Sequence, residues 1–289
     1  MDSTFVVGID VGGQTSKIGV VNARGTVLAQ TVIRTDTYDQ VEPYIAELAD
    51  AVKKLIAESG TEGKVRGIGV GAPNGNYYTG TIENAPNLLW GRQRVEFAKL
   101  LTEAMGGLPV ALTNDANAAA VGEMTYGAAR GMKNFIMITL GTGVGSGIVI
   151  NGEVVYGHDG FAGELGHTAA VRNNGRTCGC GKTGCLETYA SATGVARTAR
   201  EWLELSDEPS VLRNLDSIAS KDVYEAAKEG DKLALKIVEF TCKILGRSFA
   251  DFGAFSAPEA IVLFGGLARA KEFLTGPIEE SMNANLLPL

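Results

Sequence analysis

Residues 5–22 read FVVGIDVGGQTSKIGVVN, and this segment sets the architecture expected for the whole chain. Its first part, FVVGID, is a short β-branched run that predicts a buried strand, and SKIGVVN predicts a second strand. The glycine-rich turn VGGQT joins the two, so the order is strand, turn, strand. A P-loop or a dinucleotide-binding fingerprint requires a helix directly after its glycines, and this order therefore excludes both.

The same pattern returns at residue 135, in the segment FIMITLGTGVGSGIVINGEVV. Four residues recur 130 positions later, namely Phe5 as Phe135, Gly13 as Gly143, Ser16 as Ser146 and Ile18 as Ile148. Each copy predicts a strand, a glycine turn, a second strand and a hairpin, and Asn151-Gly152 is typical of a type I′ turn. Identities are few and chance similarity stays open, but the shared order of elements favours a duplication. Two such halves would leave a cleft between them, with one glycine turn from each half facing it.

Apolar patterns predict the elements between and after the two copies. Helices are expected at 41–56, 95–105, 117–128, 187–204, 216–229, 232–255 and in a last segment up to 282. Further strands are expected at 65–73, 109–115 and 260–264, and the irregular polar stretch 74–91 is long enough to be functional. We therefore expect an α/β protein with a smaller domain at 1–113 and a larger domain at 114–289.

A cluster of metal-binding residue types lies in the segment 157–187. Its spacing is H-x₁₀-C-x-C-x₄-C, formed by His167, Cys178, Cys180 and Cys185. Thiolate and imidazole ligands at short, glycine-rich spacing are typical of a closed tetrahedral Zn²⁺ site, which predicts a structural zinc in the larger domain.

Two carboxylates, Glu164 and Glu187, flank this cluster. Together with His167 they supply the acceptors and donors that a polyhydroxylated ligand needs. Solvated loop charge is the ordinary alternative for both glutamates.

The bulk composition bounds the class of protein. The chain has 289 residues, 45% hydrophobic and 20% charged, which is typical of a globular protein. A net charge of −7 predicts no binding of nucleic acid or an anionic membrane, and no apolar run approaches the ~20 residues of a spanning helix. The chain enters a strand at Phe5 without a signal-like region, and three clustered cysteines plus Cys242 do not form a disulfide framework. We expect a reducing, cytoplasmic location.

The glycine turns could hold phosphate groups through their backbone N–H groups, with Thr15 and Lys17 as additional donors. A tight β-turn is the ordinary interpretation of each, but two such turns facing one cleft favour nucleotide binding. A third turn could border the base or ribose, or simply bend the chain after a strand. The glycines and the threonine that this prediction concerns are Gly12, Gly13, Thr142, Gly143, Gly265 and Gly266.

Asn114 and Asp115 lie where an expected strand ends and an expected helix begins. Both residue types favour helix N-caps, which is the ordinary interpretation. The functional alternative is a carboxylate at the edge of the sheet that accepts a hydroxyl proton. Asp10, at the end of the first strand, could help to position Mg²⁺ through water.

These motifs resemble those of the ROK family of sugar kinases and related repressors, within the actin-like ATPase fold. The resembling segments are DVGGQTSK, NDANAAAVGE, LGTGVGSGIVINGEVVYGHDGFAGELGH and CGCGKTGCLE, which together cover most of the chain. The resemblance implies two ribonuclease-H-like domains around a central cleft. It also implies ATP-dependent phosphorylation of a hexose at its 6-hydroxyl, with glucose as the first candidate.

The resemblance assigns roles to individual residues. Asp115 matches the family's catalytic base, and His167 would contact the sugar as well as zinc. The positions matching sugar contacts are Gly71, Asn74, Asn87, Asn114, Asp115, Glu164, His167 and Glu187. Those matching the nucleotide side are Asp10, Gly12, Gly13, Thr15, Lys17, Thr142, Gly143, Gly265 and Gly266.

Two departures from the family pattern bear on this expectation. Asn74 stands where the family usually has glycine, which could reshape the sugar pocket. The chain ends at Leu289, whereas the family continues with a strand and a helix that pack on the first domain, so we expect either a truncation or weaker stability and closure.

Several functions stay open within the resemblance. N-acetylmannosamine, N-acetylglucosamine, fructose or allose could replace glucose, because single hydroxyl epimers are not readable from sequence. A repressor would need a helix–turn–helix domain ahead of Asp10, for which we expect no room, and a non-catalytic sugar-sensing protein is disfavoured by Asp115. The resemblance alone suggests an oligomeric state, which is a homodimer.

Overall fold

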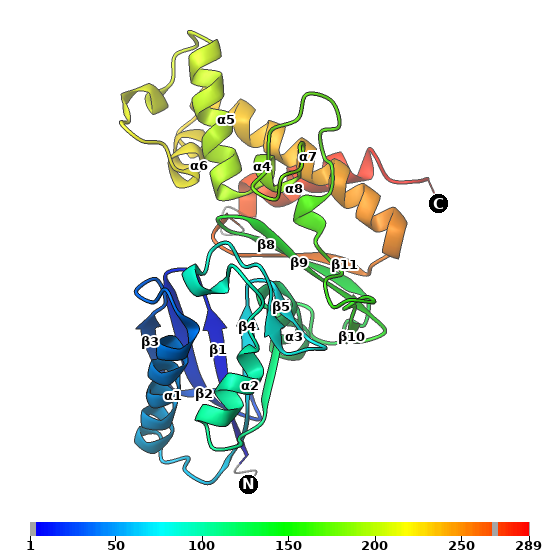
Figure 1. The fold of residues 1–289 in the computed structure, drawn as a ribbon. Helices are drawn as coiled ribbons and strands as arrows, with labels where there is room; N and C mark the ends of the chain where they lie inside the picture. The colour runs from blue at the N-terminus through cyan, green and yellow to red at the C-terminus, as the bar shows by residue number, and fades with distance from the viewer. Residues whose placement is uncertain (1–3, 268–270, 289) are drawn as a thin grey trace. The chain divides into compact units, whose positions relative to one another are not determined.

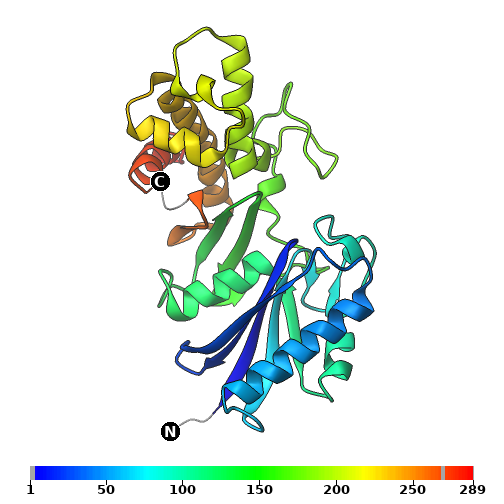
Figure 2. The same cartoon turned by 90° about the vertical axis from the view of Figure 1, so that its left-hand side faces the viewer.

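The structure is a computed structural model that describes residues 4–267 and 271–288 (Figures 1 and 2). Backbone contacts divide the chain into two compact units. The first is Met1–Arg130 with Val154–Ala162, and the second is Gly131–Glu153 with Gly163–Leu289. These contacts group residues 114–130 with the first unit, and the expected domain division after residue 113 stays a prediction.

The first unit is built on a five-stranded sheet in the order β3-β2-β1-β4-β7. β1 runs antiparallel to β2 and parallel to β4, β2 runs antiparallel to β3, and β4 runs parallel to β7. The strands confirm the meander and the later strands predicted from sequence: β1 (Phe5–Val11), β2 (Thr15–Asn22), β3 (Val27–Arg34), β4 (Val65–Ala72) and β7 (Val110–Asn114).

Helices cover both faces of this sheet, as Figure 2 shows. α1 (Val41–Glu58) and α2 (Phe97–Ala104) pack on one face and share its hydrophobic core, while α3 (Asp115–Tyr126) packs against β4 and β7 on the other. The predicted 3.6-residue stripe of α1 is confirmed, because Ile45, Leu48, Val52 and Leu55 are all buried.

The long polar stretch before α2 contains three short elements, β5 (Gly75–Asn76), β6 (Thr81–Ile82) and η1 (Leu89–Gly91). Residues of this stretch hold the segment 154–162 in the first unit. Tyr77 stacks on Tyr156 with 4.2 Å between ring centroids, and the hydroxyl of Tyr78 donates to the carbonyl of Gly157 over 2.8 Å. A segment that follows the second glycine turn in sequence thus belongs to the first unit in space.

A second sheet has four strands in the order β10-β9-β8-β11, and all of it except Val154 belongs to the second unit. Its strands are β8 (Phe135–Leu140), β9 (Val144–Ile150), β10 (Glu153–Val154) and β11 (Ala260–Phe264). Asn151 and Gly152 both have positive φ angles, of 54° and 83°, which a type I′ turn requires and which confirms the predicted hairpin.

Helices and two short 3₁₀ helices make up most of the rest of the second unit. They are η2 (Leu165–His167), α4 (Glu187–Ala190), α5 (Ala192–Leu205), η3 (Val211–Asn214), α6 (Ser220–Lys228), α7 (Lys232–Ser256) and α8 (Lys271–Asn283). The helix expected over 187–204 is in fact two helices. They are separated at Ser191, whose backbone is extended rather than helical. Its side-chain oxygen accepts a hydrogen bond from the N–H of Gly194 and so caps the start of α5.

The two sheets share the pattern expected of a duplication. β8 runs antiparallel to β9 and parallel to β11, as β1 does to β2 and β4. β1 begins at Phe5 and β8 begins at Phe135, which are the two positions that the sequence comparison paired. Among the described residues, no helix combines the length and apolarity needed to cross a bilayer.

Candidate active site and metal centre

The start of α3 carries the candidate catalytic carboxylate. Oδ1 of Asn114 accepts a hydrogen bond from the N–H of Ala116 over 2.9 Å, so Asn114 is the N-cap. Oδ1 of Asp115 accepts from the same N–H over 2.8 Å. The ordinary interpretation therefore holds for Asn114, and Asp115 is the first helical residue.

Asp115 lies next to two other predicted site residues in the first unit. In the sheet register Asp10 is opposite Gly71, and Gly71 is opposite Thr113, two residues before Asp115. A Cβ atom at Gly71 would lie 3.4 Å from Cα of Asp115 and 3.1 Å from Cβ of Ala118. Glycine at position 71 therefore lets α3 begin close against β4.

The surroundings of Asp115 make its carboxyl group less acidic. Asp115 has an exposed side, yet many protein atoms surround the carboxyl group, and this desolvation raises its pKa. The hydrogen bond from Ala116 opposes the shift, and the negative charge of Asp10 adds to it, so the net direction of the pKa is upward. A raised pKa brings an aspartate nearer to the range in which it can accept a proton during a reaction.

The first glycine turn is closed by its own backbone. The N–H of Gly12 donates to the carbonyl of Thr15 over 3.1 Å, and a Cβ atom at Gly13 would lie 2.8 Å from the carbonyl oxygen of Asn87. Glycine at 13 thus allows this turn to lie against Asn87, which brings two predicted site positions together.

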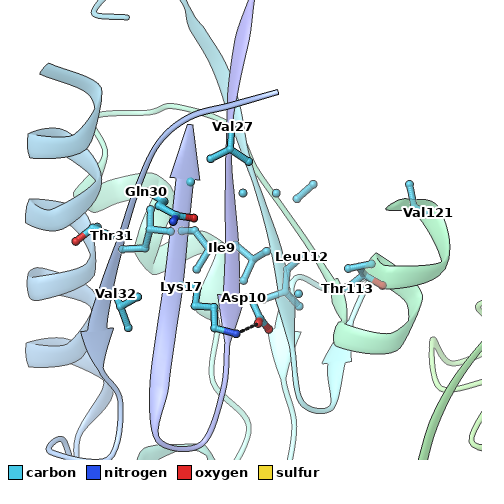
Figure 3. A pocket seen from close by; sticks show the side chains of 18 of the residues that line it. Ile9, Asp10, Lys17, Val27, Gln30, Thr31, Val32, Leu112, Thr113 and Val121 are labelled. Carbon is cyan, nitrogen blue, oxygen red and sulfur yellow. Dashed lines mark ion pairs between the residues drawn. The ribbon is translucent and has the colours of Figure 1, made fainter. Parts of the chain in front are cut away.

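A hollow of about 930 Å³ opens on the sheet of the first unit beside this turn (Figure 3). Nζ of Lys17 lies 3.9 Å from Oδ2 of Asp10 on its wall, and both side chains are well exposed. Gly71, Tyr77 and Thr113 also line this hollow. Both an acidic and a basic group are therefore available to a ligand there.

Asn74 has a left-handed backbone, with φ of 51°, which explains why glycine or asparagine suits this position. Its side-chain nitrogen donates to the carbonyl oxygens of Glu83 and Asn84, each over 3.0 Å. The amide hydrogens of Asn74 are thus used within its own loop. Any contact it makes with a sugar would have to come from its oxygen.

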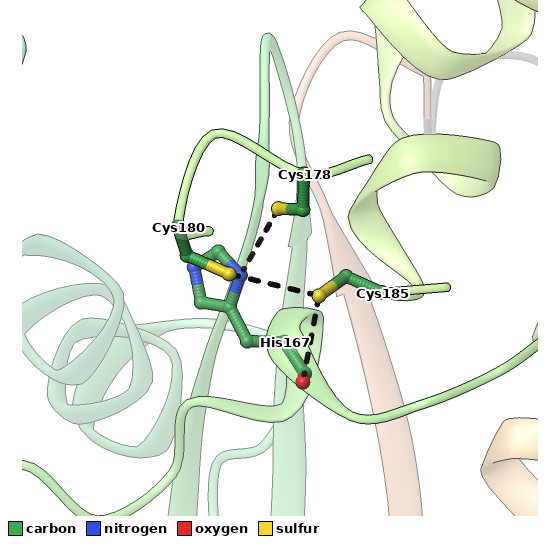
Figure 4. Close-up of side chains that lie close together, drawn as sticks. All are labelled: His167, Cys178, Cys180 and Cys185. Carbon is green, nitrogen blue, oxygen red and sulfur yellow. Dashed lines mark hydrogen bonds between the residues drawn. The ribbon is translucent and has the colours of Figure 1, made fainter. Parts of the chain in front are cut away.

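The predicted metal ligands converge in the second unit (Figure 4). The ligand atoms of His167, Cys178, Cys180 and Cys185 all lie within 4.8 Å of one another. Sγ of Cys180 is 3.7 Å from Sγ of Cys185, and Sγ of Cys178 is 3.6 Å from Nδ1 of His167. Ligands of one tetrahedral zinc are separated by roughly 3.5–3.8 Å, because zinc–sulfur and zinc–nitrogen bonds are about 2.3 and 2.0–2.1 Å long. The donor set and its spacing therefore fit zinc.

Glu187 links this cluster to the second glycine turn. Its Oε1 lies 3.9 Å from Sγ of Cys178, and its Oε2 accepts a hydrogen bond from the N–H of Val144 over 3.0 Å. A Cβ atom at Gly143 would clash with the same Oε2. The predicted sugar contact and the predicted phosphate turn are thus adjacent in this unit.

The third glycine pair lies against the second turn as well. Gly265 has a φ of 103°, and a Cβ atom there would lie 2.5 Å from the carbonyl oxygen of Leu140, which precedes the turn. The carbonyl of Thr142 accepts a hydrogen bond from Oγ1 of Thr193 over 2.8 Å, whereas Gly266 has open space around its Cα.

A family model described as "ROK family" matches residues 6–288. The chain belongs to the ROK family. This agrees with the mixed α/β fold and with a Cys/His cluster that could hold a metal ion.

Solved structures and characterised relatives of this family extend over nearly the whole chain. A glucokinase of Halalkalibacterium halodurans is 40% identical over 100% of this chain and 88% of its own length. The ROK family glucokinase of Streptomyces griseus, solved in complex with glucose and AMPPNP, is 32% identical with a TM-score of 0.79, covering 98% of this chain and 90% of its own. The ROK hexokinase of Thermus thermophilus is 30% identical with a TM-score of 0.81, covering 97% and 90%.

Three residues in or near the ROK motifs have structural roles that the sequence did not indicate. Oγ of Ser146 donates to the carbonyl of Gly163 and accepts from the N–H of Leu165 over 3.1 Å, which fixes the segment between Glu164 and His167 on β9. Nζ of Lys182 donates to the carbonyl of His167 over 2.8 Å. Ser146 stood out only as part of the repeat. Lys182 and Arg176 gave no signal beyond that of ordinary loop charge.

Proposed function

We propose that this chain transfers the γ-phosphoryl group of ATP to the 6-hydroxyl of glucose. The observation that carries the proposal is the retention of Asp115 at the start of α3, beside Gly71 and with a raised pKa, in a chain that matches glucokinases along its whole length. The complex of a related glucokinase with glucose and AMPPNP supports the same pair of substrates.

Asp115 would act as the general base in this reaction. A carboxylate oxygen of Asp115 would orient the 6-hydroxyl and accept its proton. The sugar oxygen bonds to the γ-phosphorus as the bond from that phosphorus to the β–γ bridging oxygen breaks, which releases ADP. Phosphoryl transfer depends on positioning and on stabilisation of charge more than on covalent chemistry by the protein. A correctly held carboxylate contributes about 10²–10⁴-fold to such a reaction.

The other predicted site residues divide into a sugar group and a phosphate group. Hydroxyl groups of the sugar would be held by Gly71, Asn74, Asn87, Asn114, Glu164, His167 and Glu187. The nucleotide would lie against Gly12, Gly13, Thr15, Lys17, Thr142, Gly143, Gly265 and Gly266. Asp10 would hold Mg²⁺ through water, and the ion when bound offsets the negative charge of the phosphates.

We also propose that His167, Cys178, Cys180 and Cys185 hold a structural zinc ion. The distances between sulfur and nitrogen atoms given above support this. A bound zinc would fix the segment 163–187, so that Glu164, His167 and Glu187 keep the positions a sugar needs. The chemistry of transfer would remain with Asp115.

The proposal also keeps four expectations from the sequence. They are two ribonuclease-H-like domains with a central cleft, a division after residue 113, a cytoplasmic location and a homodimer. Closure of such a cleft would exclude water, which otherwise hydrolyses ATP.

A substrate panel tests the function directly. The purified chain is incubated with Mg²⁺–ATP and, in turn, glucose, fructose, allose, N-acetylglucosamine or N-acetylmannosamine, and ADP formation is measured. The Asp115→Asn variant serves as the control for contaminating kinases. Glucose is expected to give the highest kcat/KM, a preference for another sugar would replace glucose in the proposal, and equal rates with and without sugar would refute catalysis.

A further inference from the structure

Arg176 is an almost buried arginine that lies two residues before Cys178, with only 9% of its side chain exposed. Its Nη1 donates to the carbonyl of Thr188 in α4 over 2.8 Å, and its Nε donates to Oε2 of Glu201 in α5 over 3.1 Å. The guanidinium carbon is 4.5 Å from the ring centroid of Tyr189, a cation–π distance. One side chain therefore joins the cysteine segment to two helices.

The backbone of Arg176 makes a further contact with α4. Its N–H donates to the hydroxyl oxygen of Tyr189 over 2.9 Å. The side chain also reaches the carbonyl of Gly194, in the first turn of α5, over 3.4 Å. Arg176 thus contacts the α4–α5 junction from both its main chain and its side chain.

The α4–α5 junction is in turn bonded to the second glycine turn. The N–H of Ala192 donates to the carbonyl of Gly141 over 2.8 Å, and Oγ1 of Thr193 donates to the carbonyl of Thr142 over 2.8 Å. Glu187, the first residue of α4, accepts from the N–H of Val144. A four-residue helix has little stability of its own, so these contacts and those of Arg176 determine where Glu187 points.

We propose that Arg176 is a positioning residue that sets α4 so that Glu187 and the turn 141–144 keep the geometry needed for sugar and phosphate. The inference rests on the proposed function for its catalytic consequence. Arginine suits this role because the N–H donors of its planar guanidinium group can bond the Glu201 carboxylate and the Thr188 carbonyl at the same time. Lysine keeps the charge but has one point of attachment, so it cannot hold Thr188 and Glu201 in the same way.

Arg197 provides a matched control. Its Nε donates to the other oxygen of Glu201, Oε1, over 2.7 Å, but its side chain is 42% exposed and lies outside the contacts to Thr188 and Tyr189. Arg176→Lys and Arg197→Lys therefore disturb the same carboxylate, and only the first disturbs α4.

The experiment compares these two variants in the full chain. Arg176→Lys is expected to raise the KM for glucose about tenfold with kcat changed less than threefold, and Arg197→Lys to change either less than twofold. In a Glu187→Gln background the effect of Arg176→Lys on KM should disappear, because Arg176 acts through Glu187. Equal KM values for both variants and the wild type, or an undiminished effect in the Glu187→Gln background, would overturn the inference.

Hydrogen–deuterium exchange on the ligand-free chain separates this inference from the proposed function. Faster exchange at residues 141–144 and 187–190 in Arg176→Lys, but not in Arg197→Lys, supports the positioning role even in a chain that phosphorylates no sugar. Unchanged exchange in both variants contradicts it. If Arg176→Lys does not fold, Glu201→Gln replaces it, because this variant leaves Arg176 without its carboxylate partner. Glu201→Gln is expected to speed exchange at the same residues to a smaller extent, and unchanged exchange there would overturn the proposal.

Discussion

Glu187 accepts a hydrogen bond from the backbone N–H of Val144 over 3.0 Å. Glu187 comes two residues after Cys185, and Val144 is the last residue of the second glycine turn, so this bond joins the cysteine cluster to that turn. A charged acceptor on a backbone donor makes a stronger hydrogen bond than a neutral pair. Through this bond the segment that carries the Cys/His cluster is connected to the second glycine turn within the second unit. Changes at either end should therefore be felt at the other.

Gly143→Ala tests this connection. The added methyl group would clash with Oε2 of Glu187, which is the mobile end of a side chain, so Glu187 is expected to move away from Val144 and the turn itself to stay in place. Loss of this charge-assisted bond should lower the free energy of unfolding by about 1.5–3 kcal/mol. Because Glu187 also leaves the position of its proposed sugar contact, the KM for glucose should rise by roughly tenfold, which corresponds to about 1.4 kcal/mol of binding. Steady-state kinetics and thermal unfolding measure the two effects.

A second background controls this prediction. In Glu187→Ala the obstacle to the methyl group is absent, so adding Gly143→Ala should change KM little further. Equal effects of Gly143→Ala with and without Glu187 would show that the methyl group disturbs the turn itself.

Replacement of Asp115 by asparagine tests the base. The amide keeps the size of the side chain and can still accept from the N–H of Ala116, so α3 should begin as before. It cannot take a proton, and kcat is expected to fall by about 10²–10⁴-fold. Glucose affinity, measured by calorimetry, should change much less. A variant with near-normal turnover would rule out Asp115 as the base.

The parts of the structure that could be predicted from the sequence are those set by residue patterns over short stretches of chain. The repeated strand–turn–strand order located β1, β2, β8 and β9, and the spacing of His167 and the three cysteines located a cluster whose atoms do converge. Both depend on periodicity or on residue type at short range, which can be read without knowledge of the fold.

Contacts between distant segments could not be predicted in this way. The bond from Val144 to Glu187 spans 43 residues, and Arg176 looks like a solvated loop charge until α4 and α5 are seen around it. The end of one helix at Ser191 was missed because the apolar pattern continues across it, while the capping bond to Gly194 is made by a single hydroxyl. Such features depend on packing rather than on propensity.

Removal of the metal should weaken sugar binding as well as the fold. Chelation removes the ion, and Cys180→Ser leaves it only three thiolate and imidazole ligands. Either change loosens the segment 163–187, because zinc ligation contributes directly to folding stability. The melting temperature is expected to fall, and the Kd for glucose to rise, because Glu164, His167 and Glu187 would no longer be held in place for the sugar. Zinc content, unfolding and calorimetry are measured on the same sample, and added zinc should restore the chelated wild type. Unchanged glucose affinity in metal-free protein would contradict the link.

The pKa of Asp115 should respond to Asp10. Desolvation is the larger cause of the raised pKa, and the negative charge of Asp10 raises it further by disfavouring a second negative charge nearby. Asp10→Asn removes that charge, so the pKa of Asp115 is expected to fall and the acid limb of kcat/KM to move to lower pH. Carboxyl NMR without Mg²⁺ measures this in isolation. Asp36→Asn, which removes a carboxylate paired with Arg34, is the control, and an equal shift in both variants would disprove the coupling.

Gly265→Ala should destabilise the second unit, whereas Gly266→Ala should not. Gly265 has a φ of 103°, a region that side chains other than glycine rarely adopt, and a Cβ atom there would lie 2.5 Å from the carbonyl oxygen of Leu140. That oxygen cannot move away cheaply, because β11 and β8 are paired in register up to Phe264 and Thr139, directly before these two residues. We expect Gly265→Ala to lower the free energy of unfolding by about 2 kcal/mol or more, since strain and a backbone clash add. Gly266 has open space around it, so its replacement should cost less than about 0.5 kcal/mol. Urea unfolding measures the free energy of unfolding of both variants. Equal values would mean that β8 and β11 shift to accommodate a side chain at Gly265 and do not hold the turn rigidly.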